Sequence, residues 1–256
     1  SDAALINPSS GRSVSGAGDV NGDGFDDLIV GVNYASPNGD LSGQSYVVFG
    51  KGSGFASNIN LLSLDGTNGF KLSGEAVNDR SGGAVSSAGD VNGDGFADLI
   101  IGASLADSSG SDSGASYVVF GKASGFASNL DLSSLDGSNG FKLSGAAADD
   151  RSGGAVSSAG DVNGDGFDDL IIGARYADPN VFRSGASYVV FGKSGGFAPN
   201  INLSSLDGTN GFKLSGIAAE DISGASVSGA GDVNGDGFGD IIIGAPGTDL
   251  DKPDRF

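Results

Sequence analysis

Short apolar segments, separated by Gly, Asn, Asp and Ser, return along this chain at regular intervals. The central part of the chain contains four segments that are rich in β-branched or aromatic residues and bounded by turn residues: 84–87, 98–102, 116–120 and 140–143. The segment at 98–102 is apolar on both faces, which is typical of a strand packed between two layers, whereas the segment at 140–143 alternates as a half-exposed strand does. No apolar stripe of period 3.6 is sustained, so we expect very little helix. Residues 124–128 and the few residues after them fit either a loop or one helical turn.

An internal repeat organises the whole chain. The string Gly-Asp-Val-Asn-Gly-Asp-Gly-Phe occurs four times at a spacing of 71 residues, and residues 81–151 and 152–222 are identical at 54 of 71 positions. Each copy is therefore expected to form the same unit, and four strands per copy suit a β-propeller blade. We predict an all-β fold in which 1–256 is a single propeller region, with three complete repeats and one partial repeat: 10–80, 81–151, 152–222 and 223–256.

The composition excludes several classes of function. The chain has no His, Cys, Met or Trp, so Ser-His-Asp triads, Cys nucleophiles, Cys/His zinc sites and disulfides are ruled out. With 32 acidic and 13 basic residues the net charge is −19, which argues against nucleic-acid binding and favours divalent cations as partners. No apolar run approaches about 18 residues, so membrane insertion is not expected.

The repeated string opens a loop of the form D-x-N-x-D-G-x-x-D. Side-chain oxygens at loop positions 1, 3, 5 and 9 and a backbone carbonyl at position 7 form the ring of hard ligands that Ca²⁺ takes. Position 8 differs between copies, as Asp26, Ala97, Asp168 and Gly239, where no ligand is needed. We predict four calcium sites, with these ligands: Asp19, Asn21, Asp23, Phe25, Asp27; Asp90, Asn92, Asp94, Phe96, Asp98; Asp161, Asn163, Asp165, Phe167, Asp169; Asp232, Asn234, Asp236, Phe238 and Asp240.

Three other kinds of loop share part of this pattern. An EF-hand needs a Glu at position 12, where this chain has Val30, Ile101, Ile172 and Ile243. A calcium-binding nonapeptide β-helix does not have a period of 71 residues. A metal-free turn rich in Asp and Asn is the remaining alternative, but three carboxylates within nine residues repel one another unless a cation is present.

The order of these elements resembles the FG-GAP repeats of integrin alpha-chain β-propellers and their bacterial relatives. A Gly-rich strand, the loop and a second strand that ends in Ile-Gly-Ala or a close variant follow one another in each copy, and only residues 244–246 give the full Gly-Ala-Pro. The resemblance implies a calcium-stabilised propeller of four-stranded FG-GAP blades, displayed outside the cell and used in adhesion or ligand binding. The family usually has seven blades and a shorter period, so this chain encodes too few blades for such a ring.

The copies differ most in the loop after the second strand, at 33–43, 104–114 and 175–185. Variable loops on a common scaffold can carry recognition, although neutral drift would give the same pattern. The residues of interest there are Tyr34, Arg175, Tyr176, Phe182 and Arg183. In contrast, the Tyr and Phe residues of the third predicted strand recur with the repeat and indicate packing.

These observations favour a non-catalytic binding module for a protein or glycan ligand. A purely structural spacer in a larger surface protein, or less readily an accessory domain of a carbohydrate-active enzyme, remains an alternative. No unrepeated pair of carboxylates suggests catalysis. The absence of Cys fits a secreted or surface-displayed bacterial protein. Loops with this type of ligand bind calcium weakly, which suits the millimolar free calcium outside cells.

The fourth repeat lacks its third and fourth strands. Residue 256 aligns with Gly185, and Ser1 aligns with the position of Leu214. Even if the first residues of the chain complete the last blade, residues 1–256 contain no counterpart of 186–213 for it. We therefore expect that residues 1–256 do not close into a ring, and that self-association or further blades from a longer parent chain cover the open edge. A compact four-bladed ring closed by inner strands is the alternative.

Overall fold

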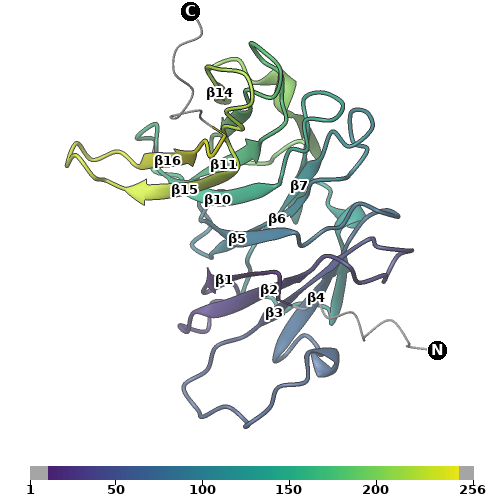
Figure 1. Ribbon diagram of the computed structural model, residues 1–256. Helices are drawn as coiled ribbons and strands as arrows, with labels where there is room; N and C mark the ends of the chain where they lie inside the picture. Colours follow the sequence, from purple (N-terminus) through teal and green to yellow (C-terminus); the bar gives the residue numbers. More distant parts are fainter. Residues whose placement is uncertain (1–10, 248–256) are drawn as a thin grey trace, which may run out of the picture.

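The computed structural model describes residues 11–247, which form four β-sheets arranged as a fan (Figure 1). The first sheet has the order β1 (Ser13–Gly18), β2 (Asp27–Val32), β3 (Gln44–Val48), β4 (Gly69–Ser73) and β8 (Asn129–Asp131). The second has the order β5 (Ala84–Gly89), β6 (Asp98–Ala103), β7 (Ala115–Val119), β9 (Gly140–Ser144) and β13 (Asn200–Asn202). The third comprises β10 (Ala155–Gly160), β11 (Asp169–Ala174), β12 (Ala186–Val190) and β14 (Gly211–Ser215), and the fourth comprises β15 (Ser226–Gly231) and β16 (Asp240–Gly244).

Each of the first three sheets contains four antiparallel strands from one repeat, which we call a blade. The predicted strands are confirmed, with ends that differ by one or two residues, and the chain is a β-propeller of such blades. The inner strands β1, β5, β10 and β15 pack against one another in succession. The described helices are three 3₁₀ turns, η2 (Leu61–Ser63), η3 (Leu132–Ser134) and η4 (Leu203–Ser205). No helix within residues 11–247 has the length and apolar character needed to cross a membrane.

A fifth strand, which the sequence pattern did not predict, links each of the first two blades to the next repeat. Residues 124–128 form a loop, and β8 follows directly and pairs in parallel with β4 of the preceding blade. The strand β13 pairs with β9 in the same way. The second and third repeats therefore each add hydrogen bonds to the outer edge of the blade before them.

Apolar side chains fill the space between neighbouring blades. Ile29 and Val47 of the first blade belong to the same buried cluster as Leu99 and Ile101 of the second. The intervening residue Ile100 faces the other way, into the cluster shared with the third blade. The Leu-Ile-Ile run is apolar on both faces because blades cover it on both sides.

Aromatic rings connect the outer parts of the blades. Phe126 of the second repeat stacks on Phe70 of the first blade with ring centroids 4.1 Å apart and planes at 4°. Phe197 stacks on Phe141 in the same way at 4.3 Å. The repeated Tyr117, like its counterparts in the other blades, is buried, which confirms that the recurring aromatics pack in the interior.

The two ends of the fan leave apolar faces exposed. Leu28 of the first blade is 57% exposed, whereas its counterpart Leu99 is fully buried. Ile242 on β16 is 62% exposed, although its counterpart Ile171 is fully buried. In Figure 1, β1 and β15 lie at opposite ends of the fan, so the described residues form an open arc.

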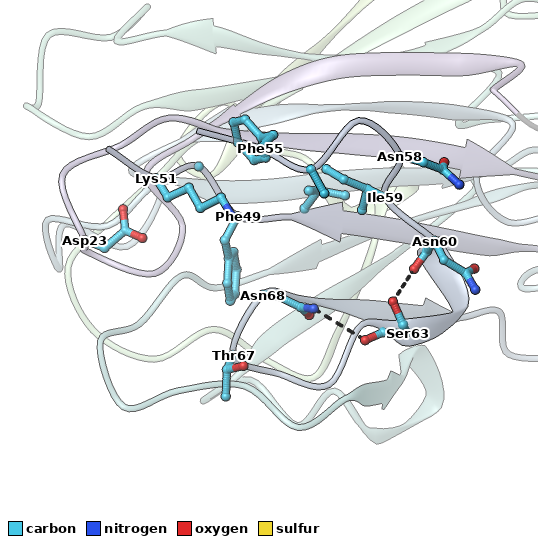
Figure 2. A pocket seen from close by; sticks show the side chains of 13 residues that line it. Asp23, Phe49, Lys51, Phe55, Asn58, Ile59, Asn60, Ser63, Thr67 and Asn68 are labelled. Atoms are coloured by element: carbon cyan, nitrogen blue, oxygen red, sulfur yellow. Dashed lines mark hydrogen bonds between the residues drawn. The ribbon is translucent and has the colours of Figure 1, made fainter. Parts of the chain in front are cut away.

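Figure 2 shows the hollow that results beside the first blade. It has a volume of about 470 Å³, and Phe49, Phe55 and Ile59 line it together with polar residues such as Asn60 and Ser63. Phe55 is the counterpart of the stacked Phe126 but is 55% exposed, because no blade within residues 11–247 receives its ring. The hollow is therefore the uncovered half of a blade-to-blade contact.

Glycines permit the close approach between the second strand of each blade and the start of the next repeat. A Cβ on Gly102 would lie 2.0 Å from the carbonyl oxygen of Gly153, and Gly31 and Gly173 have the same relation to Gly82 and Gly224 at 2.1 Å. A side chain at these positions would push the blades apart.

We predict that Gly102→Ala lowers the free energy of unfolding by about 2 kcal/mol or more, because the added methyl group collides with backbone that has no room to move. Gly54→Ala is the control, since a Cβ there meets nothing within 4 Å and should change stability by less than about 0.5 kcal/mol. Urea denaturation measures both, and equal effects would contradict the interpretation.

Candidate metal centre

The four Asp-rich loops connect the inner strand of each blade to the second strand. In the first blade β1 and β2 pair as an antiparallel hairpin, and the register shifts between Gly16 and Gly18 just before the loop. The other three hairpins have the same irregularity. The bulge and the left-handed glycine that follows it turn the chain sharply, so all four loops leave their blades in the same way.

Asp19, at loop position 1, organises the first loop. Its Oδ1 accepts hydrogen bonds from the backbone N–H groups of Gly22 at 2.7 Å and Asp23 at 3.0 Å, and its Oδ2 accepts one from Gly24 at 2.8 Å. Asp90, Asp161 and Asp232 repeat this pattern. The carboxylate thus holds the loop in a tight ring around itself.

The side chains at positions 3 and 5 belong to the same ring. Asn21 Oδ1 accepts from the N–H of Asp23 at 2.9 Å, and Asn21 Nδ2 donates to Asp23 Oδ2 at 3.0 Å. Asp23 Oδ1 accepts from the N–H of Phe25 at 3.0 Å. The oxygens at positions 1, 3 and 5 are therefore collected on a short, exposed segment.

In the first three loops the position-9 carboxylate is buried beneath the loop. Asp27 Oδ2 accepts from the N–H of Val20 at 3.0 Å, and Oδ1 accepts from Gly50 at 2.7 Å, which ties the loop to the end of β3. Burial raises the pKa of Asp27 to about 6, and the charges of Asp23 and Asp19 act in the same direction. Burial likewise raises the pKa of Asp98 to about 7. A cation beside these groups would favour their ionised forms.

The chemistry of the donors fits calcium, but the described geometry does not by itself define a metal site. Within residues 11–247, no three acidic, His or Cys side chains are grouped so that they could hold a metal ion. Both oxygens of Asp27 already accept N–H groups, although each oxygen keeps a second lone pair. The donors are all oxygen, as calcium requires. The ligand assignment and the number of ions stay predictions.

The loops also stack on one another, which the sequence analysis did not anticipate. A Cβ on Gly22 would lie 2.4 Å from Cε1 of Phe96, so the ring of the second loop covers the first loop. Phe167 covers Gly93 in the same way. The backbone N–H of Ala97 donates to the carbonyl of Asp19 at 3.1 Å. The same Phe occurs at position 7 of every loop, where the sequence pattern predicts only a backbone carbonyl ligand.

The variable loops lie at the other end of the blades. Because β2 begins at Asp27 in the Asp-rich loop and ends at Val32, the loop that carries Tyr34 emerges at the end of the blade opposite the Asp-rich loop. The third-repeat loop carries Tyr176, with the guanidinium carbons of Arg175 and Arg183 at 4.9 and 5.0 Å from the centre of its ring. The structure thus brings most of the predicted recognition residues of that loop together.

Comparison with known proteins finds a family model described as FG-GAP repeat, which matches four segments that together cover more than half of the chain: residues 10–48, 81–119, 152–190 and 223–255. The chain is similar to integrin alpha pat-2 of Caenorhabditis elegans, with 32% identity over 89% of this chain and 17% of that protein. It is 29% identical to integrin alpha-V of Gallus gallus over 91% of this chain and 20% of that protein. It thus spans about a fifth or less of the length of these relatives.

We predict that Phe96→Ala lowers the free energy of unfolding by about 1 to 2 kcal/mol, because the ring is half-buried against the neighbouring loop. Phe25→Ala is the matched control: Phe25 occupies the same loop position, is 44% exposed and has no preceding loop to cover. In urea denaturation, Phe25→Ala should lower the free energy of unfolding clearly less than Phe96→Ala does. Equal losses would show that the stacking of loops contributes nothing.

Proposed function

Because the chain belongs to the FG-GAP repeat family, we propose that it is a calcium-binding, non-catalytic module for adhesion or ligand binding outside the cell. The observation that carries this proposal is the set of four stacked Asp-rich loops at one end of the blades. The variable loops at the opposite end are then available for a protein or glycan ligand.

Calcium would be held by the carboxylates at positions 1, 5 and 9, the Asn amide at position 3 and the carbonyl at position 7 of each loop. Its charge would relieve the repulsion among three carboxylates that the metal-free loop offsets only with N–H groups. Because each of the first three loops is covered by the Phe of the next loop, an ion that rigidifies one loop would also support its neighbour.

The type of calcium ligand supports an extracellular location. Calcium is available there at millimolar level, which suits exposed loops of this kind. The chain has no Cys, so metal ions would supply the rigidity that disulfides give other secreted proteins, as in a bacterial surface protein. A non-catalytic role is supported by the absence of His and Cys from the sequence and by the repeated placement of its acidic residues.

The exposed apolar faces at the two ends of the arc support a role for further blades. Leu28 and Ile242 occupy positions that are buried between blades elsewhere in the arc. We propose that blades of the same kind cover these faces, from a longer chain or from a second copy.

For the isolated chain we predict concentration-dependent association in sedimentation velocity, because burial of the end faces removes apolar surface from water. Leu28→Ser and Ile242→Ser should each weaken it. A monodisperse monomer at every concentration, with a ring-shaped scattering envelope, would contradict the proposal.

We predict that calcium stabilises the chain and that EDTA lowers its melting temperature. A site with a dissociation constant a hundredfold below the free calcium concentration adds about 2.7 kcal/mol. Calorimetric titration of the chain should give four ions, and Asp23→Ala should reduce the count to three.

Asp26→Ala is the control for this titration. It removes the same charge from the same loop at position 8, where the second repeat already has Ala97. This variant should keep all four ions. An unchanged melting curve in EDTA, or equal effects of the two variants, would refute the calcium proposal.

A further inference from the structure

Four arginines converge on one small cavity at the end of the blades opposite the Asp-rich loops. The cavity has a volume of about 140 Å³ and is lined by Arg12, Arg80, Arg151 and Arg175, together with Tyr34 and Asn33 among others. None of its lining residues is acidic. The whole chain contains six arginines and has a net charge of −19. A cavity lined by four of these arginines is therefore a positively charged site on an acidic protein.

Little in the described structure neutralises these arginines. Residues 11–247 contain two ion pairs, Lys142 with Glu75 and Arg151 with Asp112 at 3.1 Å, so Arg151 is the one member of the four that has an acidic partner there. The Nε atoms of Arg80 and Arg175 are buried without a hydrogen-bond partner. The Oδ1 of Asn33 is also unpartnered, and that residue is only 5% exposed. Buried polar atoms of this kind normally have a partner.

Tyrosine rings fix three of the four guanidinium groups around the cavity. Arg80 lies over Tyr34 at 5.1 Å, while Arg151 and Arg175 lie over Tyr176 at 5.2 and 4.9 Å. Stacking on a ring orders a guanidinium group while its N–H donors stay free at the edges. Like charges held this close repel one another, and an anion between them would remove the repulsion.

Two of the four arginines depart from the repeat. Arg12 aligns with Gly83 and Gly154, and Arg175 aligns with Asn33 and Ser104. The scaffold therefore forms without an arginine at either position. Arg12 and Arg175 nevertheless line the same cavity, although they belong to the first and third repeats.

We propose that this cavity binds an oxyanion group, a carboxylate or sulfate, carried by the ligand of the module. The planar forks of arginine match the paired oxygens of such groups. The cavity, of about 140 Å³, is small, so we expect it to take one anionic group of the ligand. This inference rests on the proposed ligand-binding role and specifies the chemistry of the ligand.

The test is a titration followed by backbone amide NMR shifts at 33–34, 104–105 and 175–176, in calcium-containing buffer. The probes are sulfate, glucuronate and N-acetylaspartate, which represent an inorganic ion, an acidic sugar and an acidic side chain, with glucose as the neutral control. We expect saturable shifts with at least one anion and none with glucose. The anion that binds most tightly of the three identifies the kind of molecule that carries the anionic group.

The variant is Arg12→Gly/Arg175→Ser, which installs residues that other repeats already have at these positions, and it should bind at least tenfold more weakly. The control is Lys51→Ser/Lys193→Ser, which removes the same charge near the Asp-rich loops and should bind as the parent does. Absence of saturable shifts with every anion, parental affinity in the arginine variant, or equal weakening in the lysine variant would each overturn the inference.

The melting temperature of each protein with and without EDTA is recorded in parallel. A chain that responds to calcium but binds none of the anions refutes only this inference. A chain that binds an anion through the arginines but ignores calcium refutes the calcium part of the proposed function instead.

Discussion

Every blade of this protein must be covered on both faces, because its sheet is apolar on both faces. Leu99 and Ile101 face one neighbour and Ile100 faces the other, so no blade can turn a polar side to water. The glycines at the second strands, the parallel strands β8 and β13 and the stacked Phe126 and Phe197 all serve this contact. The arc arises because the same contact is repeated from blade to blade.

The repeated contact also divides the molecule into two ends with different chemistry. Hairpins from inner to second strands place every Asp-rich loop at one end, where the loops stack. The variable loops and the arginines gather at the other end, close to the starts of the inner strands. An acidic end that is the same in every repeat and a basic cavity that differs between repeats suit a scaffold and a recognition site respectively.

Much of this could be predicted from the sequence, because it is encoded locally. The period, the four strands of each blade and the Asp-rich loops follow from patterns within 71 residues. The strand β8 was missed because three residues, Asn129–Asp131, carry too little pattern, and its partner β4 belongs to another repeat. The packing of Phe96 over Gly22 depends on how the blades stack, and so does the placement of Arg12 and Arg175 around one cavity. No local sequence pattern contains this information.

The central claim is that calcium occupies the Asp-rich loops. A crystal structure of the chain grown with calcium, with an anomalous difference map collected at long wavelength, tests this most directly. The account predicts one peak in each loop, with oxygens of positions 1, 3, 5, 7 and 9 at about 2.3 to 2.6 Å from it. Loops that keep the hydrogen bonds from Gly22 and Gly24 to Asp19 and show no anomalous peak would contradict the claim.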